Sequence, residues 1–208
     1  TFGRDTVTQW ISVGEIRGSD LASEVVLVGA HLDSWDLGTG ATDNGAGSIA
    51  VLEAARILGA LKAAGVRPRR TIRFVFFTGE EQGLYGSQYY ALAHRGELPR
   101  FQAVLVLDNG SGRITGMALQ GWDELRSLWT AMMQPLASLG PLAVRSGNKT
   151  GTDHLAFLPF RVPSFNYDQI AKGYDHTHHS QMDVFDAAVP QDIAQAGTVM
   201  AVNAWQLA

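Results

Sequence analysis

Short runs of apolar residues, many of them β-branched, alternate along this chain with longer segments in which apolar residues recur every three or four positions. An uninterrupted run such as 24–30 or 71–77 is typical of a strand buried on both faces of a sheet. Residues 47–61 instead have helical spacing, and Gly65 and Pro68 follow them to end the helix. By the same criteria the predicted strands are 7–17, 24–30, 71–77, 103–107 and 162–167, and the predicted helices are 47–61, 87–93, 125–139 and 191–207.

Strands that alternate with helices predict an α/β domain, because parallel neighbours in a sheet are joined by crossover connections that are usually helical. We therefore expect a mostly parallel sheet with helices on both faces. The chain has no run of Pro, Ser or charged residues that would mark a linker, and it has no internal repeat. Residues 1–208 are predicted to form a single domain.

Composition narrows the classes of function. With 208 residues, 46% of them hydrophobic, the chain can bury a sizeable core without disulfides. It has no Cys, which excludes disulfides, thiolate metal sites and cysteine nucleophiles. Its 16 basic and 20 acidic residues give a net charge of −4 without a basic stripe, so nucleic acid is not an expected partner. The apolar runs are too short to span a bilayer, and neither a signal peptide nor a membrane partner is predicted.

Acidic residues and a histidine follow three of the predicted strands. His31 and Asp33 come after the first buried strand, Glu80 and Glu81 after the second, and Asp108 after the third. Ligands of open α/β sheets bind outside the carboxyl ends of the strands, so these residue types are expected at one edge of the sheet. Neighbours on a strand point to opposite faces, so Glu80 and Glu81 can both reach the site only from an irregular turn.

Two loops supply further candidates. Asp43 lies in a Gly-rich segment before the first long helix, and His176, His178 and His179 lie in the segment YDHTHHSQMD. Histidines and carboxylates without Cys suit zinc or another divalent first-row metal. Several carboxylates suggest more than one ion, because a carboxylate can bridge two metals.

Each candidate also has an ordinary structural interpretation. His31 could be a hydrogen-bonded core histidine, and Asp43 could cap a turn in its loop. The pair Glu80 and Glu81 could lie in a solvated turn, and Asp108 begins a common turn sequence with Asn and Gly. Their joint occurrence at one sheet edge favours a functional site over coincidence. The sequence lacks both a G-x-S-x-G elbow and a G-x-G-x-x-G directly after a strand, which disfavours a serine hydrolase and a nucleotide-dependent oxidoreductase.

Five segments of the chain resemble those of a known family. They read VGAHLDSWDLGTGATDNGAG, FFTGEEQGLYGS, VLDNG, TGTDHLAF and HHSQMD, and together they resemble the M28 zinc metallopeptidases. The strings HLDSWD and GATDNGAG are most similar to the carboxypeptidase Q-like branch, and the resemblance covers about residues 8–205. It implies an α/β fold with a mixed, mostly parallel twisted sheet flanked by helices on both faces, as in zinc-dependent exopeptidases. It also implies that 1–208 is a catalytic peptidase domain, with the family's N-terminal region and any protease-associated insert absent.

The resemblance also implies a ligand set for two Zn²⁺ ions per chain. One ion would be held by His31 and Asp108, the other by Glu81 and His179, with Asp43 bridging both. The family's last histidine ligand precedes Ser or Thr and has an acid three residues after that, a pattern that His179 fits better than His176. His178 and His176 stay open as alternatives to His179.

Two further residues would serve the reaction by the same resemblance. Glu80 would be the general base, and Asp33 would orient the His31 ring through a hydrogen bond. A cis peptide bond is expected between Asp43 and Asn44. The implied function is that of a dinuclear zinc exopeptidase, an aminopeptidase or a carboxypeptidase, which hydrolyses peptides or dipeptides with metal-activated water. The alternatives are a single-zinc enzyme similar to glutaminyl cyclases and a non-catalytic metal-binding relative, and a metal count would separate the three.

Other features of the chain leave alternatives open. Asp153 and His154 either lie in a loop that lines the site or cap the helix that follows.

A cation at the cleft would favour a free carboxylate of the substrate, whereas an acid would favour a free amine. The resemblance further suggests a secreted or periplasmic location, and a homodimer is a candidate assembly. Aromatic residues that could line a substrate pocket or pack in the core are Trp35, Phe165, Tyr167 and Tyr174, and cations near the predicted loops are Arg145, Lys149 and Lys172.

Overall fold

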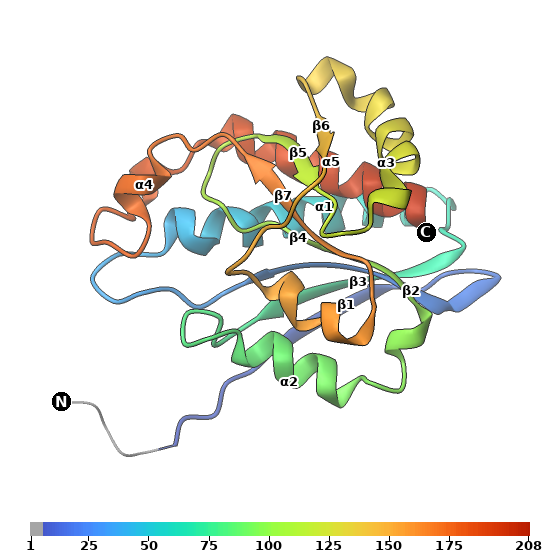
Figure 1. Ribbon diagram of the computed structural model, residues 1–208, viewed down its shortest axis with the longest axis horizontal. Coiled ribbons are helices and arrows are strands. Elements are labelled where there is room, and N and C mark those ends of the chain that lie inside the picture. The colour runs from blue at the N-terminus through green and yellow to red at the C-terminus, as the bar shows by residue number, and fades with distance from the viewer. Residues whose placement is uncertain (1–5) are drawn as a thin grey trace.

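The computed structural model describes residues 6–208. One sheet runs through the molecule, with the strand order β1-β3-β2-β4-β7-β5-β6 (Figure 1). Four strand pairs are parallel, whereas β1 with β3 and β5 with β7 are antiparallel. The predicted class, a mixed and mostly parallel sheet, is confirmed. The strands are β1 Ser12–Ile16, β2 Leu21–His31, β3 Arg70–Phe77, β4 Phe101–Val106, β5 Ile114–Ala118, β6 Ala143–Arg145 and β7 Ser164–Gln169.

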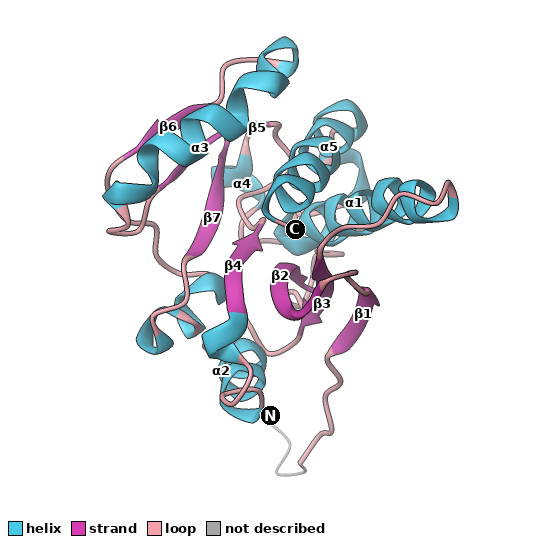
Figure 2. Cartoon of the chain, turned by 90° about the vertical axis from the view of Figure 1, so that its right-hand side faces the viewer, coloured by secondary structure: helices cyan, strands magenta, loops and turns pink. Residues whose placement is uncertain are grey.

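Helices cover both faces of the sheet, as predicted. Helices α1 and α5 pack together on one face, and α2 lies on the other side of β4 (Figure 2). Because side chains alternate along a strand, Val26 and Val28 of β2 join the core under α1 and α5, whereas Leu27 joins the core on the side of α2. Both faces are buried, which explains the uninterrupted apolar run in β2. The helices are α1 Ala46–Ala63, α2 Tyr85–Ala93, α3 Arg126–Met133, α4 Tyr174–Thr177 and α5 Pro190–Leu207.

The structure differs from the predicted elements in several places. The edge strand is shorter than 7–17, and the helix predicted for 125–139 ends as an α-helix at Met133. A 3₁₀ segment, Gln134–Leu139, follows because Pro135 has no backbone N–H to continue the α-helix. Helix α4 was not predicted, and neither were strands β5 and β6. Both are short, and β5 contains Gly116, where a Cβ atom would collide with the backbone of Ala143 in β6.

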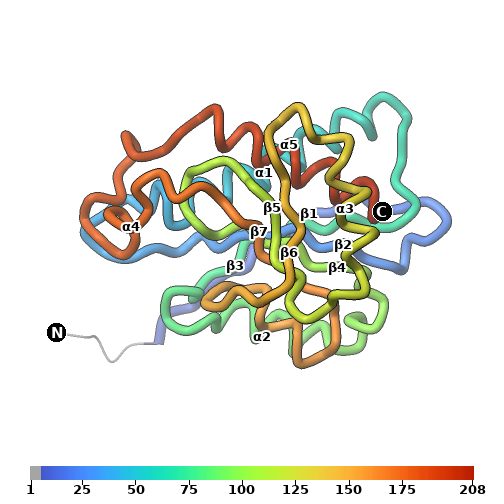
Figure 3. The backbone as a smooth tube through the Cα atoms, turned by 45° about the horizontal axis from the view of Figure 1, so that its top comes forward, coloured from blue at the N-terminus to red at the C-terminus, as the bar shows by residue number. Residues whose placement is uncertain are grey.

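The fold brings segments that are distant in sequence to one end of the sheet. The loop after β2 lies beside α4, as the tube in Figure 3 shows, and the hydroxyls of Thr42 and Thr177 are 2.8 Å apart there. Within residues 6–208, no helix has the length and apolar character needed to cross a membrane.

Candidate metal centre

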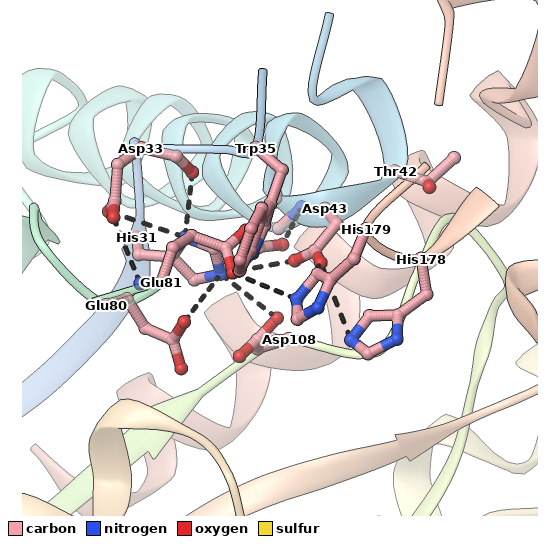
Figure 4. Close-up of polar contacts among 12 residues, drawn as sticks. His31, Asp33, Trp35, Thr42, Asp43, Glu80, Glu81, Asp108, His178 and His179 are labelled. Atoms are coloured by element: carbon pink, nitrogen blue, oxygen red, sulfur yellow. Dashed lines mark hydrogen bonds and ion pairs between the residues drawn. The ribbon is translucent and has the colours of Figure 1, made fainter. Parts of the chain in front are cut away.

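The carboxyl ends of three adjacent strands meet at one site, as predicted. His31 is the last residue of β2, and Asp108 follows β4 directly beside it. His31 Nε2 lies 3.3 Å from Asp108 Oδ1 and 3.9 Å from Glu80 Oε2, which comes from the turn after β3 (Figure 4). The ring of His31 is buried. The parallel pairing of β3, β2 and β4 therefore places the three side chains at one edge.

Asp43 lies between two histidines. Its Oδ1 is 3.4 Å from His31 Nε2, and its Oδ2 is 3.4 Å from His179 Nε2. His179 Nε2 is also 2.9 Å from Glu81 Oε2. One carboxylate thus presents a different oxygen to each side, the arrangement expected of a ligand that bridges two ions.

The residues also form three compact groups of metal-ligand types. In each group, ligand atoms lie within 4.8 Å of one another. The groups are His31, Glu80 and Asp108; His31, Asp43 and Glu81; and Asp43, His178 and His179.

The three histidines of α4 and the turn after it are placed differently. His179 contacts Glu81 and Asp43, and His178 reaches Asp43 at 3.8 Å. His176 is exposed and pairs with Asp175. The rings of His178 and His179 stack, with centroids 3.7 Å apart. The geometry therefore brings His179 and His178 to the site and leaves His176 outside it.

Hydrogen bonds to the main chain hold Asp43 in place. The carboxylate of Asp183 accepts the backbone N–H groups of Thr42 at 2.6 Å and of Asp43 at 2.9 Å. The Asn44 side chain donates to the carbonyl of Leu107, the residue after β4. The peptide bond between Asp43 and Asn44 is cis, as expected. In the sequence, Asp183 is the acid that completes the pattern around His179. The sequence did not show that Asp183 also holds the loop that carries Asp43.

Asp33 connects the first histidine to the turn after β3. His31 Nδ1 donates to the main-chain oxygen of Asp33 at 3.0 Å, while the Asp33 carboxylate is 3.6 Å away. A carbonyl only accepts, so Nδ1 carries a proton in this contact, and Nε2 is the ring nitrogen that faces the carboxylates of Asp43 and Asp108. The carboxylate itself accepts the backbone N–H of Glu81 at 3.1 Å. Asp33 thus contacts His31 as predicted, but through its main chain.

The buried carboxylates perturb one another. Burial and the nearby Asp108 carboxylate raise the pKa of Glu80 to about 9, and burial and Asp43 raise the pKa of Glu81 to about 7. Burial lowers the pKa of His31, but Asp108 and the other carboxylates outweigh it, so the net shift is upward. Among the described residues, Asp43 Oδ2 and Glu81 Oε1 are buried without a hydrogen-bond partner. Oxygen and imidazole donors around excess negative charge fit divalent cations.

A cleft of about 490 Å³ opens over this cluster. Glu80, Glu81 and Asp108 line one part of it, and residues 150–152 and Tyr174 line another. Phe165 and Tyr167 are fully buried, so these two aromatics pack in the core. Trp35 is half exposed, and its indole N–H donates to Glu81 Oε2. This contact had no signal in the sequence beyond the position of Trp35 between two candidate residues.

Asp153 and His154 lie behind the cleft rather than in it. Both are fully buried, and the Asp153 side chain does not cap the 3₁₀ segment that it begins. His154 Nε2 lies 2.6 Å from the Gln120 amide nitrogen, and its Nδ1 lies 2.5 Å from the Thr152 hydroxyl. Because Thr152 lines the cleft, this pair of contacts supports the 150–152 wall.

Comparisons with known proteins identify the family of this chain. The model of peptidase family M28 matches residues 12–204. The chain belongs to peptidase family M28. It is 38% identical over 198 residues to carboxypeptidase Q of Mus musculus, a match that covers 95% of this chain and 41% of that protein.

Solved structures of M28 peptidases have the same fold. An M28 peptidase precursor from Shewanella amazonensis SB2B is 36% identical, with a TM-score of 0.86 over 94% of this chain and 43% of that chain. A zinc aminopeptidase from Bacillus subtilis is 25% identical, with a TM-score of 0.75 over 93% of this chain and 49% of that chain. The M28 chain described here spans about two fifths of the length of its curated relatives.

Proposed function

We propose that this M28 chain is the catalytic domain of a dinuclear zinc exopeptidase that hydrolyses peptides or dipeptides. The observation that carries the proposal is the position of Asp43, whose two oxygens face His31 and His179 at equal distance. Family membership supports a peptidase, and the zinc aminopeptidase of similar structure supports the choice of metal.

The proposed ligands divide into two sets that share Asp43. His31 and Asp108 complete the first set, in which all ligands are buried. Glu81 and His179 complete the second set. Bound zinc supplies a Lewis acid that polarises the peptide carbonyl and lowers the pKa of water at the site.

Glu80 is proposed as the general base. It lines the cleft, and its carboxylate lies beside the first set without being one of the proposed ligands. Its pKa of about 9 reflects burial and the nearby carboxylate of Asp108, and a nearby divalent cation lowers such a pKa toward the working range. In this role Glu80 accepts a proton from water at its carboxylate and returns it to the leaving amine.

We propose a free amine rather than a free carboxylate at the substrate end, because a free carboxylate would need a cation in the cleft. Arg145 and Lys149 pair with Asp168, and Lys172 pairs with Asp192. Of the residues that the structure describes, those lining the cleft include neither Lys nor Arg, and their four carboxylates are the proposed base and zinc ligands. Substrate profiling tests this point, since peptides with a blocked amine should be cleaved poorly and peptides with a blocked carboxylate should be cleaved well.

A secreted or periplasmic location is proposed on the family resemblance, and a homodimer is proposed as a candidate assembly. Fractionation of the source cells tests the first proposal. Sedimentation of the purified protein tests the second.

The decisive experiment is the zinc content of the purified chain, measured by elemental analysis after zinc loading and dialysis. About two zinc ions per folded chain are expected. One ion would favour an enzyme similar to glutaminyl cyclases, and none would favour a non-catalytic relative or show that the ligand assignment is wrong.

A further inference from the structure

Trp35 contacts two proposed ligands of the same metal position. Its indole N–H donates to Glu81 Oε2 at 2.7 Å. Its ring lies against the imidazole of His179, with centroids 5.0 Å apart and planes tilted by 34°. A tryptophan that is 51% exposed could point into solvent, but this one contacts Glu81 and His179, the two side chains that belong to the second set alone (Figure 4).

The loop after β2 holds Glu81 at two points. Asp33 accepts the Glu81 backbone N–H, and Trp35 donates to one oxygen of the Glu81 side chain. The other oxygen, Oε1, is buried and has no hydrogen-bond partner in the described part of the chain. Oε2, the oxygen that accepts from the indole, is also the one that lies 2.9 Å from His179 Nε2, so Trp35 contacts the Glu81 oxygen that faces the other proposed ligand.

His179 depends on its aromatic neighbours for its orientation. It has a left-handed backbone with φ of 55°, and its side chain is 40% exposed. Its ring lies between Trp35 and His178 in Figure 4 and stacks on His178. Strand pairing fixes His31, whereas side-chain packing limits the rotation of His179.

We propose that Trp35 is a positioning residue for the second metal position. It fixes one oxygen of Glu81 and the ring plane of His179, so both ligands are oriented before zinc binds. This inference rests on the proposed dinuclear site. It predicts that loss of Trp35 weakens one zinc ion selectively, because the first set does not include the residues that Trp35 contacts.

The test is a zinc titration of the full chain in competition with a chelator, which yields two dissociation constants. Trp35→Phe keeps an aromatic ring but lacks the N–H, and Trp35→Leu lacks both. Loss of such an outer contact typically lowers metal affinity about 10- to 100-fold. We expect a loss of about 10-fold for the second zinc in Trp35→Phe, a larger loss in Trp35→Leu, and little change for the first zinc. His179→Ala identifies the second zinc, because it should lack that ion.

Trp10→Phe provides a matched control, since Trp10 is 76% exposed and lies outside the site. Both of its dissociation constants should equal those of the wild type. Tryptophan emission gives a second readout: filling of the second position should change it in the wild type and in Trp10→Phe, but not in Trp35→Phe.

Three outcomes would contradict the inference. Unchanged affinity for both ions in Trp35→Phe would remove Trp35 from this role. Equal weakening of both ions would show a general structural effect instead. A wild-type chain that binds fewer than two zinc ions would overturn the proposed function, and this inference with it. If Trp35→Leu does not fold, Trp35→Phe decides the question.

Discussion

His31 and His179 are the histidines of the two proposed metal positions, and the fold holds them in different ways. His31 ends a central strand, and only 1% of its side chain is exposed. Its Nδ1 donates a hydrogen bond to the main-chain carbonyl of Asp33, two residues along the chain. His179 follows a short helix in a left-handed conformation, and 40% of its side chain is exposed.

The two histidines show two ways in which a fold can position metal ligands before the metal binds. The first position is built from strand ends, whose spacing is set by the hydrogen bonds of the sheet. The second is built from loops, whose side chains are held by other side chains such as Trp35 and Asp183. We therefore expect changes at the first position to affect folding as well as metal binding, and changes at the second to affect mainly the metal.

The largest effect is expected where the two positions meet. Asp43→Ala removes the proposed shared ligand, so both zinc ions and hydrolysis should be lost together. Elemental analysis and a peptide assay measure both. Asp36→Ala, an exposed aspartate in the same loop, is the control. Two tightly held ions in Asp43→Ala would show that Asp43 does not bridge.

Glu80→Gln separates the loss of hydrolysis from the loss of zinc binding. The amide cannot take a proton from water, so kcat should fall about 10²- to 10⁴-fold while two zinc ions remain bound. Glu124→Gln, at an exposed site away from the cleft, should keep full activity. Normal turnover of Glu80→Gln would exclude Glu80 as the base.

Two alanine substitutions compare the positions directly, with stability measured by urea unfolding of the metal-free protein. His31→Ala leaves buried carboxylates without their cationic partner and should lower the free energy of unfolding by about 3 kcal/mol. His179→Ala changes a partly exposed residue and should cost about 0.5 kcal/mol or less. His176→Ala, on an exposed side chain, is the control. Equal losses in His31→Ala and His179→Ala would contradict the distinction drawn between the positions.

His154 gives a pH-dependent test of the cleft wall. Burial lowers the pKa of the His154 ring from 6.5 to about 4, because the charged form loses its hydration. The neutral ring contacts Gln120 and Thr152. The unfolded chain binds the proton first, so this stability is complete above about pH 6.5 and is lost as the pH falls toward about 4. A shift of this size corresponds to about 3 kcal/mol.

The measurement is urea unfolding of metal-free protein at pH 7 and pH 4. His154→Gln should lose less stability between these pH values than the wild type, whereas His176→Gln should behave like the wild type. An identical pH dependence in His154→Gln and the wild type would show that the buried ring does not resist protonation.

The sequence predicted the long central strands well and the short strands poorly. The central strands were predicted because both of their faces are buried, which leaves an uninterrupted apolar run in the sequence. Strands β5 and β6 were missed because they are short, and Gly116 weakens the pattern of β5. Gly116 is needed where two backbones approach closely, a requirement that becomes visible only when both strands are placed.

The sequence by itself determined that His31, Glu80, Glu81 and Asp108 would meet, because the carboxyl ends of neighbouring parallel strands share one edge. It also supplied the family pattern that pointed to Asp43 and His179. Only the tertiary structure decided which oxygen of Asp43 faces which histidine, and that Asp183 and Trp35 hold the loops. The physical reason is that a strand end is placed by regular main-chain hydrogen bonds, whereas a loop is placed by contacts between residues far apart in the chain.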